Sequence, residues 1–385
     1  MTVVNLPVQD GTVQPASLAA PADLDVRSTP PTSREVYAAG HVVADRLHAC
    51  ADSAAGQIDW DATLQLRRDL WALGLGVAES MDTAQRGMGL RWADARELAV
   101  RTLADSADTG GKVVVGVSTD QIESHHPSLE EIADAYLEQI ATVEAHGGHT
   151  VMMASRHLAR AATGPDDYLA VYHRVLEAVT APVILHWLGA AFDPALAGYW
   201  GFDEPKAAMP TVADLIAAHP DTVRGIKVSL LDPALEIQLR QQICAPARVY
   251  TGDDYNYVDM IAGEGSQHSD ALLGAFAAVP RFASAAFAKL DDGDTAAFRN
   301  ILATTIPLSR LIFAAPTQYY KVGVAWLTYL DGRQDHFRMI AGFETGRSLL
   351  HLADLVRTAG AIGLFGDPDF TARRAGAYFD AQGIS

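Results

Sequence analysis

The chain has 385 residues, 49% of them hydrophobic, which is enough for one large α/β barrel or two ordinary domains. Its formal net charge of -18 argues against a nucleic-acid or anionic-membrane partner, because either would need a basic face. No apolar run reaches the roughly 18 residues that span a bilayer, and no secretory signal is visible near the N-terminus.

The two cysteines, Cys50 and Cys244, are far apart and form neither a disulfide framework nor a metal-ligand spacing. We therefore expect a cytoplasmic protein that acts on a small molecule, with no nucleic-acid or membrane partner and no bound metal or other cofactor.

The chain is expected to fall into three segments. Residues 1–33 are rich in Pro, Ala, Ser and Thr without sustained periodicity, which predicts an irregular, extended arm laid over another surface. In residues 34–280, strand-length apolar runs alternate with helix-length amphipathic stretches, a pattern typical of βαβ units. Residues 281–385 carry a helical pattern. Because no long polar linker precedes them, we expect an extension of the barrel and not an independent domain.

The expected strands are, in chain order, 36–44, 74–80, 112–118, 150–154, 181–185, 223–228, 248–252 and 271–276. The expected helices include 60–72, 92–107, one that starts at the capping-box pattern Ser128-Leu129-Glu130-Glu131, 165–179, 281–290, 295–304, 319–330, 338–359 and 370–382.

These strands, each followed by a helix or loop over about 250 residues, predict a closed (β/α)8 barrel, or TIM barrel, of the α/β class. A doubly wound open sheet is the alternative. It usually carries a Gly-rich phosphate turn after its first strand, and none follows residues 36–44.

One lysine stands out. Among the five lysines, only Lys227 occupies the middle of a predicted strand, with Ile226 and Val228 on either side, whereas Lys289 and Lys321 lie in helical patterns. A lysine amine removed from water loses preference for its charged form, so its pKa falls and it can attack a carbonyl. The alternative is a strand-end lysine whose amine reaches solvent.

The chemistry of such a barrel lies at the carboxyl ends of its strands. The polar residues at those ends are Glu79, Asp82, Gln85, Ser118, Asp120, Ser155, Arg156, His157, His186, Lys227, Ser229, Asp253 and Asp254. Asp253 is equally well explained as a turn or helix-cap residue, and His186 as a hydrogen-bonded histidine of the barrel rim. Glu79, in an apolar strand, needs a partner or a role.

Five short segments occur in an order that resembles a known family. They are Ile58-Asp59, Asp82-Thr83-Ala84-Gln85-Arg86, Pro182-Val183-Ile184-Leu185-His186-Trp187, Gly225-Ile226-Lys227 and Gly252-Asp253-Asp254. Together they resemble the lysine-dependent aldolase family of dihydrodipicolinate synthase and N-acetylneuraminate lyase, over about residues 55 to 280. The resemblance implies a Schiff base on Lys227, a supporting role for Thr83, and a homodimer or homotetramer.

The chain departs from that family where substrate would bind. Ala84 replaces the second of two adjacent threonines, and Asp82 replaces a glycine, so a substrate carboxylate would meet a like charge. The family's tyrosine in the fourth strand is absent, and His157 or Arg156 stands in its place as the candidate proton carrier. We expect a polyhydroxylated keto compound rather than pyruvate. The predicted substrate-binding residues are Glu79, Asp82, Gln85, Arg156, His186, Ser229 and Asp253.

Three hypotheses follow. The first is a class I lyase in which Lys227 is the nucleophile, His157 moves the proton and Thr83 assists. The second is a divalent-metal sugar isomerase, epimerase or aldolase on the same barrel, with Glu79, His186, Asp253 and His157 as ligands. The third is a non-catalytic barrel that binds a small molecule or a partner. The aromatic residues of the C-terminal helices, Tyr319 and Tyr320 among them, are expected in the core or at an oligomer contact.

Overall fold

The structure, a computed structural model, describes residues 2–50, 57–264 and 267–384. Eight parallel strands close into a barrel in the order β10-β3-β4-β5-β6-β7-β8-β9, which confirms the predicted (β/α)8 architecture. The strands are β3 (Val36–Ala39), β4 (Gly76–Glu79), β5 (Val113–Val117), β6 (His149–Met152), β7 (Val183–Leu188), β8 (Val223–Ser229), β9 (Arg248–Thr251) and β10 (Asp270–Leu273). All eight lie within the segment predicted to form the barrel.

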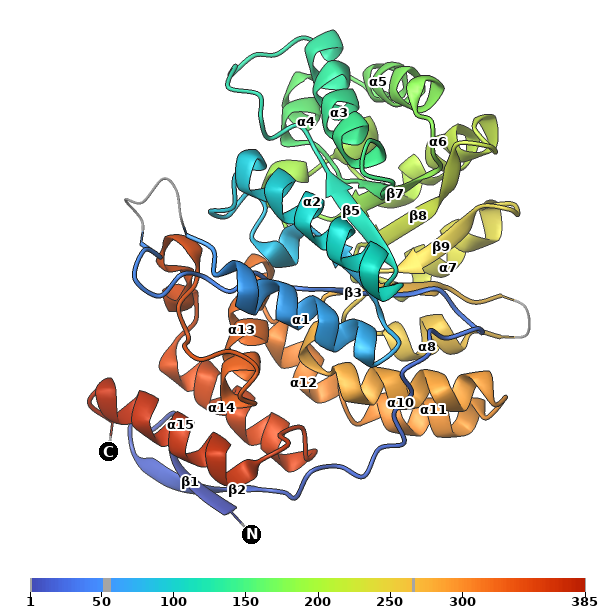
Figure 1. The fold of residues 1–385 in the computed structure, drawn as a ribbon. Helices are drawn as coiled ribbons and strands as arrows, with labels where there is room; N and C mark the ends of the chain where they lie inside the picture. Colours follow the sequence, from blue (N-terminus) through green and yellow to red (C-terminus); the bar gives the residue numbers. More distant parts are fainter. Residues whose placement is uncertain (1, 51–56, 265–266, 385) are drawn as a thin grey trace.

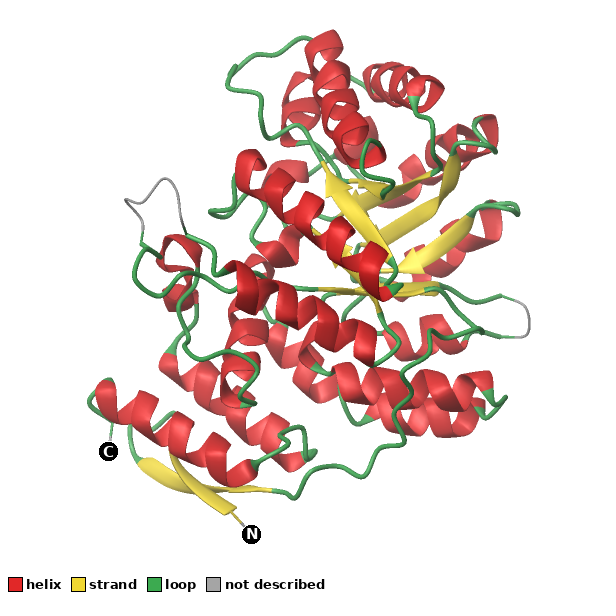
Figure 2. Cartoon of the chain, viewed as in Figure 1, coloured by secondary structure: helices red, strands yellow, loops and turns green. Residues whose placement is uncertain are grey.

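Helices surround the strands, as Figure 2 shows. They are α1 (Trp60–Ala72), α2 (Trp92–Thr109), α3 (Leu129–Glu144), α4 (Arg156–Ala161), α5 (Pro165–Ala178), α6 (Pro205–Ala218), α7 (Pro233–Gln242), α8 (Tyr257–Ala262) and α9 (Ala275–Ala278). The predicted capping box before α3 is present: the Ser128 hydroxyl accepts from the Glu131 N–H, and the Glu131 carboxylate accepts from the Ser128 N–H. Such caps fix where each helix leaves the barrel rim.

The barrel lumen is filled by its own side chains. Inward-facing residues form one buried cluster of Tyr37, Ala39, Ala78, Met81, Val114, Val151, Met153, Ile184, Tyr250 and Leu272. Alternate residues of the same strands, such as Leu185 and Trp187, pack outward against the helices instead. The lumen is therefore a packed core, and polar chemistry is confined to the carboxyl ends of the strands.

A C-terminal set of helices continues from the barrel, as predicted. It comprises α10 (Pro280–Asp291), α11 (Thr295–Ala303), α12 (Ile306–Ile312), α13 (Tyr320–Leu330), α14 (Leu349–Ala361) and α15 (Pro368–Ala381). The single helix predicted at 338–359 is wrong. Residues Ile340–Gly346 form an irregular 3-10 segment, η5, in which Ala341 and Gly342 adopt positive φ angles of 58° and 73°, so α14 starts only at Leu349.

The N-terminal arm is more regular than predicted. Strands β1 (Thr2–Pro7) and β2 (Val13–Leu18) pair as an antiparallel hairpin, which lies beside α15 at the edge of the molecule (Figure 1). Leu6 and Leu18 are buried, and the Arg357 guanidinium of α14 donates to the carbonyls of Leu6 and Pro7. The arm does lie over another surface, as expected, but as a hairpin.

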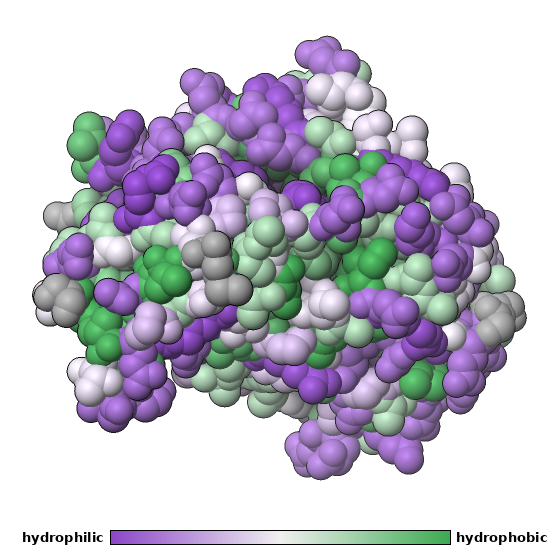
Figure 3. Space-filling model, turned by 90° about the horizontal axis from the view of Figure 1, so that it is seen from below, coloured by the Kyte–Doolittle hydropathy of each residue, from purple (hydrophilic) through white to green (hydrophobic). Residues whose placement is uncertain are grey.

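The outer surface mixes residue types. On the face seen from below, hydrophilic and hydrophobic residues alternate over short distances (Figure 3). Within the described ranges, no helix is both long and apolar enough to cross a membrane.

Candidate active site

Lys227 lies on β8 with its side chain in the barrel. In the parallel register it stands beside His186 of β7 and Tyr250 of β9, and only 7% of it is exposed. Its amine makes no hydrogen bond or ion pair with any residue that the structure describes. Burial lowers the pKa of Lys227, against the opposing charges of Asp82 and Asp254. The amine is therefore shielded, unpaired and biased toward its neutral, nucleophilic form.

Asp254, in the turn after β9, is the buried carboxyl that acts on Lys227. It is 4% exposed, and its Oδ1 accepts the Ala275 N–H at 2.9 Å. Burial raises the pKa of Asp254 to about 7, although that hydrogen bond and Lys227 both favour its charged form. A carboxyl that titrates near neutrality within the electrostatic reach of an amine can exchange a proton with it.

His186 and Ser229 form a second polar contact in the lumen. The Nε2 atom of His186 lies 3.1 Å from Oγ of Ser229, and both side chains are buried. Burial, and then the charge of Lys227, lower the pKa of His186 well below its usual value, so the imidazole is neutral. Its Nδ1 has no partner among the described residues, which leaves a polar atom available next to Lys227.

Thr83 and Tyr320 form a hydroxyl pair from opposite ends of the chain. Thr83 Oγ1 lies 2.7 Å from the Tyr320 hydroxyl, and both side chains are buried. Burial raises the pKa of Tyr320 well above its usual value, so this phenol is a neutral donor or acceptor. Gly274 makes room for the pair, because a Cβ there would lie 3.3 Å from Thr83 Oγ1 and 3.1 Å from the Tyr320 ring.

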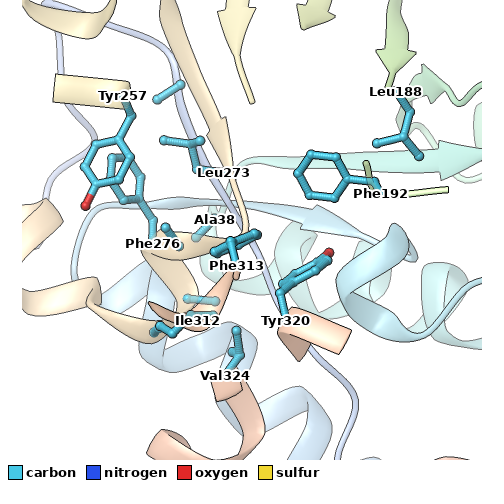
Figure 4. Close-up of a cluster of buried hydrophobic side chains, with 14 of the residues drawn as sticks. Ala38, Leu188, Phe192, Tyr257, Leu273, Phe276, Ile312, Phe313, Tyr320 and Val324 are labelled. Atoms are coloured by element: carbon cyan, nitrogen blue, oxygen red, sulfur yellow. The ribbon is translucent and has the colours of Figure 1, made fainter. Parts of the chain in front are cut away.

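The ring of Tyr320 belongs to an aromatic group at this end of the barrel. It stacks on Phe313, with ring centroids 4.4 Å apart, and Phe192 meets both rings edge-on at centroid distances of 6.2 and 6.1 Å. Figure 4 shows Phe192 and Leu188 facing Phe313 and Tyr320 across this space. The C-terminal helices therefore contribute directly to the site, beyond the core or oligomer contacts expected of their aromatic residues.

Two adjoining cavities open at this end of the barrel. The first, of about 330 Å³, is lined by Asp82, Arg86, Gly87, Ser118, Thr119, Asp120, Ile122, Met153, Ala154, Arg156, His157, Arg160, Leu188, Asp193 and Leu196. The second, of about 240 Å³, is lined by Asp82, Arg86, Met88, Arg156, Leu188, Phe192, Asp193, Pro194, Gln318, Tyr319, Tyr320, Lys321 and Phe343. Lys227 lines neither cavity. Asp82 lines both cavities, and its charge acts on the Lys227 amine, so this residue lies between the cavities and the amine.

His157 and Arg156 lie at the start of α4, on the wall of the first cavity. His157 Nδ1 is 2.9 Å from Oγ1 of Thr119, and burial lowers the pKa of this half-buried imidazole. The Arg156 guanidinium pairs with Asp193 at 2.5 Å and borders both cavities. Of the two candidates for the proton carrier, His157 is the one suited to accept a proton, because its lowered pKa leaves the imidazole neutral at neutral pH.

Of the seven predicted substrate ligands, Asp82 and Arg156 line the cavities, whereas Glu79, Gln85, His186, Ser229 and Asp253 do not. Both oxygens of Glu79 are bound by the buried Arg67 guanidinium at 2.8 and 2.9 Å, which supplies the partner that its position demanded. The side-chain amide of Gln85 donates hydrogen bonds to the backbone carbonyls of Met88 and Ile340 and accepts one from the Ile340 N–H. Asp253 accepts from the N–H groups of Tyr255 and Asn256, the turn role that was its alternative reading.

The four side chains of the metal hypothesis each form hydrogen bonds with a different partner. Glu79 bonds with Arg67, His186 with Ser229, His157 with Thr119, and Asp253 with the backbone of its own turn. Across residues 2–50, 57–264 and 267–384, no group of three or more His, Cys, Asp or Glu side chains is arranged to hold a metal ion.

Sequence reasoning missed Tyr320 and Lys321 and gave less weight to Asp254 than to Asp253. The Gly-Asp-Asp motif located both aspartates, but their spacing alone does not tell which one turns inward. Tyr320 and Lys321 carry no signal of this kind, because they stand in a helical pattern 237 residues beyond Thr83.

Solved structures with the same fold are numerous, although their sequences are distant. A putative dihydrodipicolinate synthetase from Pseudomonas aeruginosa aligns with a TM-score of 0.60 and 16% identity, over 83% of this chain and 99% of that one. Dihydrodipicolinate synthase from Aquifex aeolicus aligns at 0.66 and 14%, over 86% and 98%. The enzyme from Thermotoga maritima aligns at 0.59 and 17%, over 85% and 98%. At these identities the likeness is one of fold.

No curated protein matches the sequence. A family described as "Protein of unknown function (DUF993)" matches residues 4–384, nearly the whole chain. The protein is thus a member of the DUF993 family, built on a barrel like that of dihydrodipicolinate synthase.

Proposed function

We propose that this protein is a Schiff-base-forming lyase, of aldolase or dehydratase type, that acts on a small carbonyl substrate. The observation that carries the proposal is Lys227, which is buried toward the carboxyl end of a barrel strand, has no ion pair with the residues that the structure describes, and has a lowered pKa. An unpaired buried ammonium is costly, so a lysine kept in this state has the properties of a nucleophile.

The surrounding groups support each proton transfer that the reaction needs. The neutral amine of Lys227 adds to the carbonyl carbon while the carbonyl oxygen takes up one proton from solvent, and the carbinolamine then loses water to give an iminium. Asp254, whose pKa is about 7, is suited to accept the proton from the amine and return it to the departing hydroxyl. In an aldolase, the iminium then accepts the electron pair of the C–C bond that breaks. In a dehydratase, it accepts the electron pair left when a substrate proton is removed, and a substrate hydroxyl then leaves as water.

Asp254 serves the amine of Lys227. The hydroxyl pair Thr83–Tyr320 and the imidazole of His157 are the proposed carriers for protons that leave or join the substrate. Thr83 and Tyr320 share one hydrogen bond, so a proton accepted by one hydroxyl can be passed to the other. The polar groups of the first cavity, which include Ser118, Thr119 and Asp120, suit the hydroxyls of a sugar-like keto compound. Because Lys227 lies outside both cavities, reaction requires side-chain movement around Asp82.

Reductive trapping tests the proposal. Borohydride added together with a panel of keto and aldehyde compounds, including pyruvate and hydroxylated ketones, should give a covalent adduct whose mass identifies the substrate. Peptide mapping should place the adduct on Lys227 and not on the exposed Lys206 of α6. If no compound is trapped, or if the adduct forms equally in Lys227→Met, the Schiff-base mechanism is wrong.

The metal-dependent alternative gives the opposite results. It requires a bound divalent ion in the purified protein, turnover that chelator abolishes, and no borohydride adduct. The homo-oligomeric state and cytoplasmic location stay predictions, which chromatography with light scattering and cell fractionation would test.

Replacement of Tyr320 by Phe should slow turnover by roughly 10²- to 10⁴-fold, the range for loss of one proton-transfer group. Stability should change little, by about 1 kcal/mol, because only the hydrogen bond to Thr83 is lost and the stacked ring stays. Tyr329→Phe, on the same helix but remote from both cavities, is the matched control. Equal turnover in the two variants would remove Tyr320 from the mechanism.

A further inference from the structure

A second buried lysine lies in the wall of the second cavity. Lys321, in the first turn of α13, is 3% exposed. Its amine contacts the Met88 sulfur at 3.3 Å and lies 5.2 Å from the centre of the Tyr320 ring. A thioether is a weak acceptor, and no carboxylate of the described residues lies within ion-pair distance. This ammonium therefore lacks the anion that a buried cation normally has.

The other cations around this cavity are already neutralised. Arg86 forms two hydrogen bonds to the Asp120 carboxylate, at 2.8 and 2.5 Å, and Arg156 pairs with Asp193. Asp82 is the remaining carboxylate of the lining, and its charge acts on Lys227 as well as on Lys321. Among the described residues of this lining, Lys321 is thus the cation without an ion pair, which leaves its amine able to take an external anion.

The backbone adds to this preference. Helix α13 begins at Tyr320, directly after the 3-10 turn η4 (Thr317–Tyr319), and no side chain of the described residues caps its N-terminus. Because Lys321 in its first turn lines the cavity, the positive end of the helix dipole lies at the same wall. The side chains of Gln318 and Tyr319 supply further hydrogen-bonding groups at the cavity. Burial lowers the pKa of Lys321 to about 8, with Asp82 and Asp193 favouring and Arg156 opposing the charged form, so most molecules carry this charge at neutral pH.

We propose that Lys321 binds an anionic group of the substrate, a carboxylate or a phosphate, in the cavity between α13 and the loop that follows β7. The inference rests on the proposed function and narrows its substrate class to a carbonyl compound with an anionic end. With that end on Lys321, the carbonyl extends past Asp82 toward Lys227. The charge of Lys321 opposes that of Asp82 in the same lining, which weakens the like-charge objection raised by the Asp82 substitution.

Calorimetric titration with inorganic phosphate and with malonate tests the site without any need for turnover. The wild-type protein should bind at least one of them, and the preferred probe tells a phosphate site from a carboxylate site. Lys321→Met keeps the side-chain length, removes an unpaired buried charge and should weaken binding at least tenfold. Lys206→Met, which removes an exposed lysine remote from the cavities, should bind as the wild type does.

The pH dependence provides a second measurement. Because the amine is the charged partner, malonate affinity should fall as the pH rises through about 8 in the wild type and stay flat in Lys321→Met. The inference is overturned if the wild type binds neither probe, or if Lys321→Met binds them as tightly as the wild type.

The anion site and the Schiff base can fail separately. Lys321-dependent anion binding without a borohydride adduct would refute the lyase and leave an anion-binding barrel. An adduct on Lys227 with no effect of Lys321→Met on anion binding would refute the anchor and leave the lyase.

Discussion

Lys227→Met should abolish turnover, with a loss of at least about 10³-fold, the scale seen when a covalent nucleophile is removed. The fold should survive, because methionine matches the length of lysine and suits the apolar side chains of the barrel lumen, such as Ile184 and Tyr250. The rate is to be measured on whichever compound the borohydride experiment identifies. Lys206→Met is the control for loss of a lysine as such, and a Lys227→Met protein with more than a tenth of wild-type activity would contradict the mechanism.

The same variant should change how stability depends on pH. Burial holds the folded-state pKa of Lys227 below its unfolded value, so between the two the unfolded chain binds more protons and wild-type stability rises with pH. Below the folded-state pKa, Lys227 is protonated in both states, and the full free-energy cost of burying its charge lowers the stability of the wild type. Lys227→Met should therefore be more stable than the wild type at neutral pH, and the difference should shrink as the pH approaches the ordinary lysine pKa of 10.5. Urea unfolding across this range measures it.

Glu79→Ala should destabilise the protein by about 3–5 kcal/mol, because it leaves the Arg67 guanidinium buried without its counter-charge. Both side chains are fully buried, and the pair joins α1 to β4. Thr102 of α2 also donates to Glu79, at 2.7 Å, so α1 and α2 both lose their acceptor on β4. Denaturant unfolding gives the free energy.

The exposed pair Glu97–Arg101 on α2 is the matched control, since Glu97→Ala should cost under about 1 kcal/mol. Glu79→Gln should fall between the two, because it keeps hydrogen-bonding oxygen while losing the charge. If Glu79→Ala cost no more stability than Glu97→Ala, the buried Arg67–Glu79 pair would not stabilise the contact between α1 and β4.

The strands were predictable because their signal is local. Residues 112–118, for example, form an apolar run bounded by Gly111 and Asp120, and β5 occupies its centre, Val113–Val117. The burial of Lys227 was predictable for the same reason, since it stands inside an apolar strand run, and its role stays a proposal. The hairpin of the arm had a signal too: Asp10-Gly11 between two short runs is a turn pattern, and Gly11 has a φ of 83°.

The rest of the site depends on contacts between distant parts of the chain. Residue type marked Glu79 as a functional carboxylate, and only the position of Arg67 on a neighbouring helix shows that it holds the barrel together. Lys321 has the sequence context of an ordinary helical lysine. Its burial follows from how α13 packs against the barrel rim, and no local pattern encodes that packing.

The hairpin at the start of the chain and the last two helices have a consequence for biosynthesis. The hairpin that carries Leu6 and Leu18 packs against α14 and α15. These two side chains are therefore fully buried only after residues more than 300 positions later have been synthesised. Meanwhile the barrel strands are complete by Leu273, well before Tyr320 and Lys321 emerge from the ribosome. A nascent chain can thus hold a finished barrel in which Thr83 still lacks its hydroxyl partner Tyr320, and competence for reaction should appear only once the closing helices dock.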